Sequence, residues 1–440
     1  MSNLEIGIWS FPALLALIFL RVPIGLAMLG VGVVGSWLAT GRWTPILAQL
    51  KSLPYDTFSS YSLSIVPLFL VMGQFASRGG MSAALFRAAA ALIGHRRGGM
   101  GMAAIGACAG FGAICGSSLA TAATMGQVAL PELKRRGYSD ALATGALAAG
   151  GTLGILIPPS VVLVIYAIIT EQNIAKLFAA AMIPGLLAAA GYMAAIALYV
   201  RVAPGAAGGA PRADRAERVA ALVAVWPVAA IFLLVIGGIY AGVFTPTEGA
   251  AVGAFLAGAV ALANGGLGLR GLADSLSATA VSTGMIFLIV LGAAVYNAFL
   301  ASTQAPQTLA AWIAALGWSP LAVLAAILLA YLAFGCVMDS LSMILLTVPI
   351  FFPVVMLLDF GLSQEETALW FGVLVLVVVE VGLITPPVGM NLFVINAMAR
   401  GAPMSATFRG AAPFVASDIL RVVILVAFPA LTLGLVRLLW

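Results

Sequence analysis

Two stretches decide the fold of this chain: Gly154-Ile155-Leu156-Ile157-Pro158-Pro159-Ser160 and Gly382-Leu383-Ile384-Thr385-Pro386-Pro387-Val388. Each places a double proline after a glycine inside an apolar run. Proline lacks an N–H and clashes with the preceding helical turn, so each pair is expected to stop a helix and leave carbonyl oxygens unpaired. Such backbone is tolerated at membrane depth only where it is buried in protein or lines a polar cavity. Two broken helices, at 154–160 and 382–389, are therefore predicted, an arrangement typical of the binding sites of secondary transporters.

The composition is that of a polytopic helical membrane protein. Of the 440 residues, 63% are hydrophobic and 8% are charged, and the mean hydropathy is +1.15. A soluble domain has about 25% charged residues, so this surface cannot face water throughout. Apolar stretches near the roughly 20 residues that span a bilayer recur from end to end. They also lack the apolar–polar alternation of barrel strands. We expect an all-α, multi-pass protein embedded in membrane lipids.

The charged and reactive residues exclude several other classes. The net charge of +5 indicates topology rather than nucleic-acid binding. Cys108, Cys115 and Cys336 lie in apolar runs without metal-ligand or redox spacing. The single histidine, His95, stands at a span end, so a histidine-based metal site is not expected. No P-loop motif is present in the sequence, so no nucleotide is expected as a cofactor.

The apolar runs divide the chain into two halves, 1–200 and 219–440, joined by the polar linker 201–218. The linker carries four arginines and is expected in the cytoplasm. Each half is predicted to contain scaffold helices, a hairpin and a broken helix. In the second half we expect an amphipathic helix and a separate crossing helix within 267–300, and one closing span at 412–439.

Each hairpin consists of two apolar segments near or below spanning length. The first, at about 97–136, is flanked by five basic residues, and the second, at about 320–358, is followed by acidic ones. If the basic flanks are cytoplasmic, the two re-entrant hairpins enter from opposite faces and the repeats are inverted. Inverted repeats around a midplane site are the architecture of alternating-access carriers.

Matching landmarks in the two halves keep nearly constant spacing, which indicates an internal repeat. The offsets are 219, 222 and 228 positions for three pairs: Gly73 and Gly292, Ser117 and Asp339, Pro158 and Pro386.

The first hairpin tip reads Gly116-Ser117-Ser118-Leu119-Ala120-Thr121. Its glycine permits a sharp reversal, and hydroxyls stand where the next helix begins. A helix N-terminus suits an anionic substrate group, while hydroxyl and carbonyl oxygens suit a hard cation such as Na⁺. The alternative is that these side chains only cap the helix or bind neighbouring helices.

The second tip contains the acidic residue Asp339, followed by Ser340. A carboxylate within the membrane is costly and suggests a function, here neutralising a bound cation, although it could also cap the next helix. Near the second break, the Thr385 hydroxyl, the freed carbonyls and the Asn391 amide are candidate ligands. Glu380, one turn earlier, either faces a cavity or pairs with an interfacial group. A capping role is sufficient for Glu248.

At these motifs the chain resembles the large membrane subunit of tripartite ATP-independent periplasmic (TRAP) transporters, the DctM-like family. The resemblance is carried by the first hairpin tip and by four further stretches: Gly137-Tyr138, Gly154–Ser160, Thr245-Pro246-Thr247-Glu248 and Glu380–Asn391. It covers essentially the whole chain and is strongest at 110–170 and 335–400.

The resemblance implies a Na⁺-driven importer of small organic acids in the bacterial inner membrane. Its expected partners are a separate small four-helix membrane subunit and a periplasmic solute-binding protein. The family's elevator motion carries both hairpins past a scaffold. Substrate contacts are expected at Ser117, Ser118, Thr121, Ser340 and Asn391. Two or more Na⁺ sites are expected at Ser117, Gly154, Pro158, Asp339, Gly382, Thr385 and Pro387.

Three alternatives stand beside this expectation. A stand-alone elevator symporter for dicarboxylates or citrate, coupled to Na⁺ or H⁺, shares inverted hairpins and needs no binding protein. An intramembrane enzyme would need an activating base beside Ser117 or a second carboxylate beside Asp339. A channel would need a continuous polar pore, and no ring of charges is apparent. The loop 361–367 is longer and more acidic than is usual in the family, so contacts with a binding protein on that face are left open.

Overall fold

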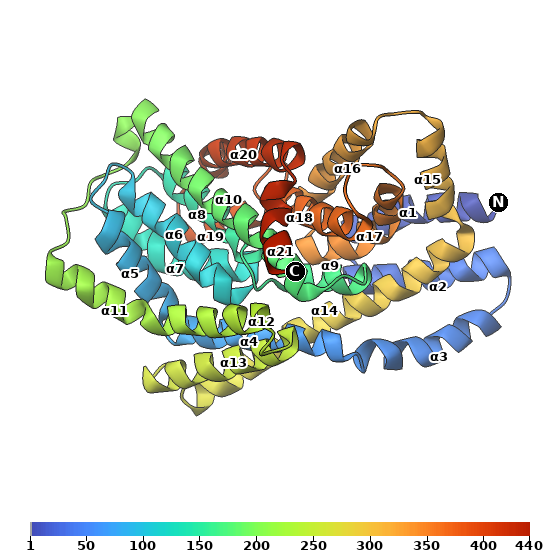
Figure 1. Cartoon of the computed structure of the whole chain (residues 1–440), viewed down its shortest axis with the longest axis horizontal. Helices are drawn as coiled ribbons and strands as arrows, with labels where there is room; N and C mark the ends of the chain where they lie inside the picture. Colours follow the sequence, from blue (N-terminus) through green and yellow to red (C-terminus); the bar gives the residue numbers. More distant parts are fainter. Residues whose placement is uncertain (1) are drawn as a thin grey trace.

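The computed structural model describes residues 2–440, apart from the side chains at positions 310 and 314, and regular structure in that range is entirely helical (Figure 1). The first half contains α1 (Asn3–Phe19), α2 (Ile24–Thr40), α3 (Thr44–Phe58), α4 (Ile65–Arg78), α5 (Met81–Ile93), α6 (Gly99–Cys115), α7 (Ser118–Arg135), α8 (Asp140–Leu156), α9 (Val161–Ile169) and α10 (Ile174–Val202).

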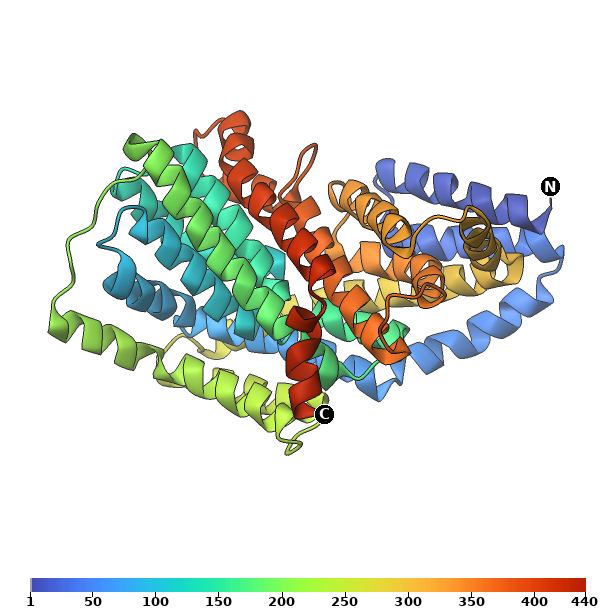
Figure 2. The same ribbon diagram turned by 45° about the horizontal axis from the view of Figure 1, so that its top comes forward.

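The second half follows a linker that loops away from the helices at the left of Figure 2. It contains α11 (Arg215–Phe232), a π-helical turn (Leu233–Gly237), α12 (Gly238–Tyr240), α13 (Pro246–Ala263), α14 (Leu269–Thr303), α15 (Ala305–Ala315), α16 (Pro320–Gly335), α17 (Ser340–Met356), α18 (Gln364–Leu383), α19 (Met390–Met398), α20 (Met404–Ala427) and α21 (Ala430–Leu439).

Both double prolines separate helices, as the sequence predicts. The chain bends by 44° between α8 and α9, across Pro158-Pro159. Pro386-Pro387 lie between α18 and α19, and α19 restarts at Gly389, whose φ of +64° favours glycine. The described chain has six helices long and apolar enough to cross a membrane, or up to eight if each bent pair is one span.

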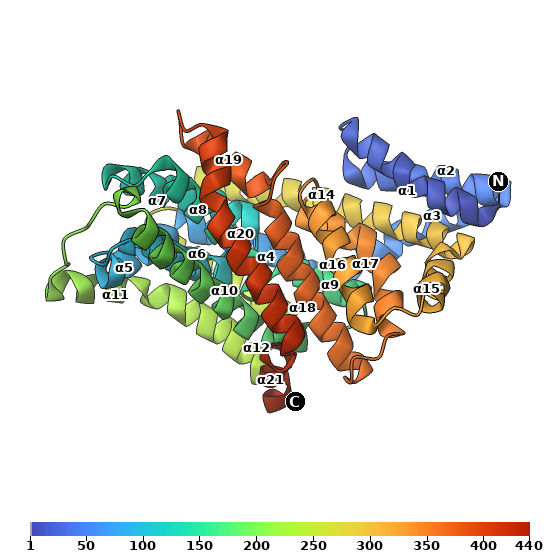
Figure 3. The same cartoon turned by 90° about the horizontal axis from the view of Figure 1, so that it is seen from above.

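The two hairpins are also present. The first consists of α6 and α7, with the reversal at Gly116 (φ +66°), and the second consists of α16 and α17. Helices α6, α16 and α17 have 17, 16 and 17 residues, which is short of the roughly 20 residues that span a bilayer. Figures 1 and 3 place the first hairpin toward one end of the long axis and the second toward the other.

Equivalent hydrogen bonds join each hairpin to the broken helix of its own half. The Val161 N–H donates to the Gly116 carbonyl over 3.4 Å, and the Gly389 N–H donates to the Cys336 carbonyl over 3.3 Å. In both cases the amide of the second residue after the double proline donates to a carbonyl at the hairpin tip. The repeat detected in the sequence is therefore also a repeat of contacts.

Long helices outside the hairpins pack closely through glycine. A Cβ at Gly25 of α2 would lie 2.8 Å from the Leu288 carbonyl of α14, and Gly292 of α14 packs against Gly25 in turn. Small residues let helix backbones approach in this way in membranes. Helices α4 and α13 form a second such pair, with the Phe75 ring against Gly258.

Two expected boundaries are wrong. The amphipathic and crossing segments expected within 267–300 form one 35-residue helix, α14, whose sequence contains no proline to interrupt it. Its counterpart in the first half is bent by 50°, between α3 and α4, where serines cluster at 59–64. The single closing span expected at 412–439 instead begins at Met404 and breaks at Pro429.

Candidate functional site

The first half of the site is formed where the hairpin tip meets α8. Ser117 is the N-cap of α7, and its Oγ accepts from the Ala120 N–H over 3.4 Å. Gly154 packs so closely here that a Cβ would lie 2.6 Å from the Ser117 carbonyl oxygen and against Thr121 Oγ1. The Thr121 hydroxyl is buried beside the Cys115 thiol, a weak hydrogen-bonding group, and has no nitrogen or oxygen partner. Two hairpin oxygens thus converge on the backbone of the broken helix.

Asn391 connects the second half of the chain to this first half-site. Its Nδ2 donates to the Ala148 carbonyl of α8 over 3.3 Å, while its Oδ1 is buried without a partner. A Cβ at Gly151 would lie 3.1 Å from the same Nδ2. Pro158, just beyond the end of α8, is buried. The first break is therefore covered by protein.

The second half of the site is built around the N-terminus of α17. Asp339 is its N-cap: Oδ2 accepts from the Ser342 N–H over 3.1 Å, and Oδ1 accepts from Ser342 Oγ over 2.5 Å. The carboxylate is half-buried. Capping and cation neutralisation are compatible here, because each oxygen retains a second lone pair.

The second broken helix packs against this hairpin through glycine. A Cβ at Gly382 would lie 2.5 Å from the Gly335 Cα. Thr385 lies in the break, and its hydroxyl donates to the Val381 carbonyl over 2.6 Å. Pro386 and Pro387 are exposed in the isolated chain, in contrast to the buried prolines of the first break.

Glu380 brings the two halves together, a role that was not predicted from the sequence. Its side chain is fully buried on α18. Ser118 Oγ donates to Glu380 Oε2, and Ser340 Oγ donates to Oε1 over 2.9 Å. These serines are the first residues of α7 and α17, so one carboxylate binds both hairpins. A carboxylate in an apolar span was the available sequence signal, but it did not identify the partners.

A second buried polar chain lies beside the site. Thr152 Oγ1 lies 2.9 Å from Tyr192 OH, which donates to Asp418 Oδ2 over 2.7 Å. Asp418 and Arg421 form an ion pair of 2.9 Å and are 0% and 3% exposed. This chain ties α8 and α10 to α20, which runs obliquely between the two ends of the molecule in Figure 2.

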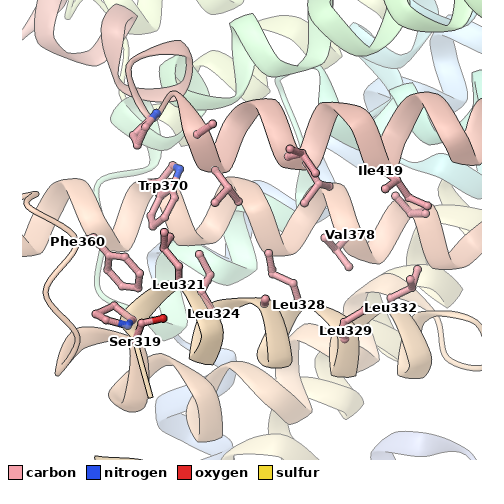
Figure 4. A pocket seen from close by; sticks show the side chains of 18 of the residues that line it. Ser319, Leu321, Leu324, Leu328, Leu329, Leu332, Phe360, Trp370, Val378 and Ile419 are labelled. Carbon is pink, nitrogen blue, oxygen red and sulfur yellow. The ribbon is translucent and has the colours of Figure 1, made fainter. Parts of the chain in front are cut away.

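A cavity of about 910 Å³ lies away from these oxygens, between α16, α18 and α20. Figure 4 shows leucines of α16 facing Val378 of α18 and Ile419 of α20. Its polar lining is limited to Ser319 and Asp359. A cavity with this lining favours apolar groups such as lipid acyl chains over a charged solute.

The oxygen donors of the site suit an alkali cation better than a transition metal. Among the described residues, no three His, Cys, Asp or Glu side chains are grouped as such a metal site requires. The donors at hand are hydroxyl, carbonyl, amide and single carboxylate oxygens, which hard cations prefer. Glu248 lies apart from the site, in a capping box with Thr245 at the start of α13.

Comparison with known proteins agrees with this architecture. The family described as "Tripartite ATP-independent periplasmic transporter, DctM component" matches residues 11–431. The C4-dicarboxylate TRAP transporter large permease protein of Pseudomonas aeruginosa is 38% identical over 383 residues, covering 87% of each chain. The sialic acid TRAP transporter large permease protein of Vibrio cholerae is 32% identical over 422 residues, covering 95% of this chain and 96% of the other.

A solved structure shares the fold at low sequence identity. The YdaH transporter of Alcanivorax borkumensis, described as having an unusual topology, gives a TM-score of 0.63 at 15% identity and covers 98% of each chain. The sequence relatives are transport permeases of the inner membrane, so this protein is an inner-membrane permease and not an enzyme. The chain belongs to the family of the large, DctM-type permease components of tripartite ATP-independent periplasmic transporters.

Proposed function

We propose that this permease imports a small organic acid, coupled to Na⁺, by an elevator motion of the unit that contains both hairpins. The observation that carries the proposal is that two of the buried oxygens without partners, Thr121 Oγ1 and Asn391 Oδ1, belong to side chains packed on the same face of α8, beside Gly154 and Gly151. A buried polar atom without a partner is rare in native proteins and calls for an explanation such as a bound ion.

Na⁺ would be held by the broken backbone and the helix caps. On the first side the proposed ligands are Thr121 Oγ1 and the carbonyl oxygens of Ser117, Gly154 and Pro158. On the second side they are the Asp339 carboxylate, the Thr385 hydroxyl and the carbonyl oxygens of Gly382 and Pro387. Asp339 supplies the formal negative charge that neutralises a desolvated cation.

The substrate carboxylate is proposed to bind at the N-terminal ends of α7 and α17. Ser118 and Ser340 are the first residues of these helices, and the free N–H groups of a first helical turn favour an anion. In this structure both hydroxyls donate to Glu380, so a bound substrate would share or replace these bonds. The Asn391 amide lies next to the first half-site and could select a polar substrate group.

The elevator motion is supported by how the helices group. Each hairpin packs on the broken helix of its own half, and α8 and α18 contact each other and α20. Helices α2, α4, α13 and α14 form a second group, which touches the first through α4 with α6 and through α14 with α17. A rigid unit that slides past such a group changes the side from which its site is reached, as alternating access requires.

The partners follow from the family. TRAP large permeases work with a solute-binding protein and usually with a small membrane subunit. We infer that this chain pairs with a separate small four-helix subunit. The nearest alternative function is a stand-alone elevator symporter for dicarboxylates or citrate, which would need no binding protein.

Uptake into liposomes distinguishes a binding-protein-dependent permease from a stand-alone symporter. The large and small subunits are reconstituted together, and radiolabelled succinate is the first probe, because a C4-dicarboxylate permease is 38% identical. We expect uptake only with an inward Na⁺ gradient and the binding protein encoded beside this chain. If succinate is not taken up, the probe becomes whichever ligand that binding protein retains on purification. Uptake without a binding protein, or without Na⁺, would overturn the proposal.

A further inference from the structure

We infer that Glu380 is a positioning residue that couples the two hairpin tips, so that binding at one half-site is transmitted to the other. The inference starts from the fact that the two oxygens of one carboxylate are divided between the repeats. Oε2 binds Ser118 of the first hairpin, and Oε1 binds Ser340 of the second. No other described side chain forms hydrogen bonds with both hairpins.

The two hydrogen bonds to Glu380 are made by residues that directly follow proposed cation ligands. Ser118 directly follows Ser117, whose carbonyl faces Gly154, and Ser340 directly follows Asp339. A shift of either tip therefore moves both a proposed cation ligand and a serine bound to Glu380. Because the other carboxylate oxygen holds the opposite tip, the shift is passed on through a rigid group only a few bonds long.

Burial makes these two bonds hard to replace. Glu380 is 0% exposed and takes part in no salt bridge among the described residues. Its nearest charged neighbours on α20, Asp418 and Arg421, are paired with each other. In a water-free site no solvent molecule replaces a lost hydrogen bond, so losing one leaves the other tip held by a less well anchored side chain.

Amide hydrogen exchange tests the link without transport. The purified complex is placed in lipid nanodiscs, and exchange is followed at the two tips, 116–121 and 336–343. We expect Ser118→Ala to speed exchange at the second tip by up to about tenfold, the factor that corresponds to one buried hydrogen bond. Ser340→Ala should have the reciprocal effect at the first tip. Either substitution cuts the same link. At each tip, exchange in the double variant should therefore be no faster than in the faster of the two single variants.

Ser342→Ala is the matched control. It removes the same hydroxyl from the same hairpin as Ser340→Ala, but Ser342 binds Asp339 rather than Glu380. Its effect should stay at the second tip. Glu380→Gln should reproduce the serine variants, and if that variant fails to fold, the serine variants alone decide the outcome. Purely local effects of both serines, or a signal at the first tip from Ser342→Ala, would overturn the inference.

Sodium titration of uptake supplies a second readout, which rests on the proposed function. We expect the Hill coefficient for Na⁺ to fall toward one in Ser118→Ala and in Ser340→Ala, and to fall no further in the double variant. An unchanged Hill coefficient in these variants, where wild-type uptake depends cooperatively on Na⁺, would contradict the coupling. Absence of any Na⁺ dependence in the wild type would instead overturn the proposed function, and the exchange experiment would still decide the link.

Discussion

Gly382→Ala tests whether the second broken helix must pack against its hairpin for the site to form. The added methyl would lie 2.5 Å from the Gly335 Cα and 2.8 Å from its carbonyl oxygen. Carbon atoms at rest are separated by about 3.5–4.0 Å. Since the obstructing atoms are backbone, no side chain can rotate away, and α16 must retreat from α18 by about 1 Å.

The expected change in half-saturating Na⁺ follows from the free-energy cost of overpacking. One extra methyl group in a packed core costs about 1–3 kcal/mol. If that strain is relieved by opening the hairpin, the closed form that binds Na⁺ becomes less populated, and the apparent affinity falls in proportion. At 1.4 kcal/mol per factor of ten, half-saturating Na⁺ should rise by roughly 5- to 150-fold.

The assay is Na⁺-dependent uptake by the reconstituted complex over a range of Na⁺ concentrations. Gly284→Ala is the control, because Gly284 lies in α14 with no atom within 4 Å of an added Cβ. Alanine there should improve helix propensity without touching the site. The same half-saturating Na⁺ in both variants, with equal thermal stability, would refute the claim that this contact shapes the site.

Three further changes separate binding from structure. Asp339→Asn should keep the cap and the unfolding temperature, because Asn caps about as well as Asp, yet abolish Na⁺-stimulated uptake; Na⁺-driven uptake that survives would show that the charge is not used. Thr121→Val removes a buried hydroxyl that has no nitrogen or oxygen partner. The unfolding temperature should therefore stay the same or rise, while half-saturating Na⁺ increases. A lower unfolding temperature with unchanged Na⁺ dependence would show that the hydroxyl has a structural role. Asp418→Asn or Arg421→Met alone should destabilise by about 3–5 kcal/mol, and the double replacement by less than the sum, as measured by thermal unfolding; additive losses would contradict a paired charge.

The breaks and hairpins could be predicted from the sequence because their causes are local. Proline and glycine act on the backbone within one turn, so Pro158 and Pro386 end helices whatever surrounds them. The start of α18 has an equally local cause, the capping box of Ser363 with Glu366, yet residues 364–367 were expected in the loop 361–367 and are helical. Amphipathic character over 267–280 predicts a boundary that α14 does not have, because no proline interrupts its backbone.

The contacts made by Glu380 could not be predicted, because they depend on three segments that meet only in the folded protein. Ser118 and Ser340 are 262 and 40 positions away from Glu380, and no spacing rule relates them. The pair of Asp418 and Arg421 is a different case. Opposite charges three positions apart inside an apolar span are visible in the sequence, and an intramembrane charge is a functional signal by default.

The exposed second break indicates which face of the protein cannot contact lipid. Two equivalent sequence devices have different surroundings: Pro158-Pro159 are buried, while Pro386-Pro387 are exposed in the isolated chain. Non-helical backbone with free carbonyl oxygens is not stable against lipid tails, because nothing there satisfies it. The surface over 385–388 must therefore adjoin water or another protein when the permease is in its membrane. Because Thr385 and Pro387 are proposed Na⁺ ligands, Na⁺ can reach the second half-site through this surface. The first half-site is covered by protein, so Na⁺ cannot reach it by the same route.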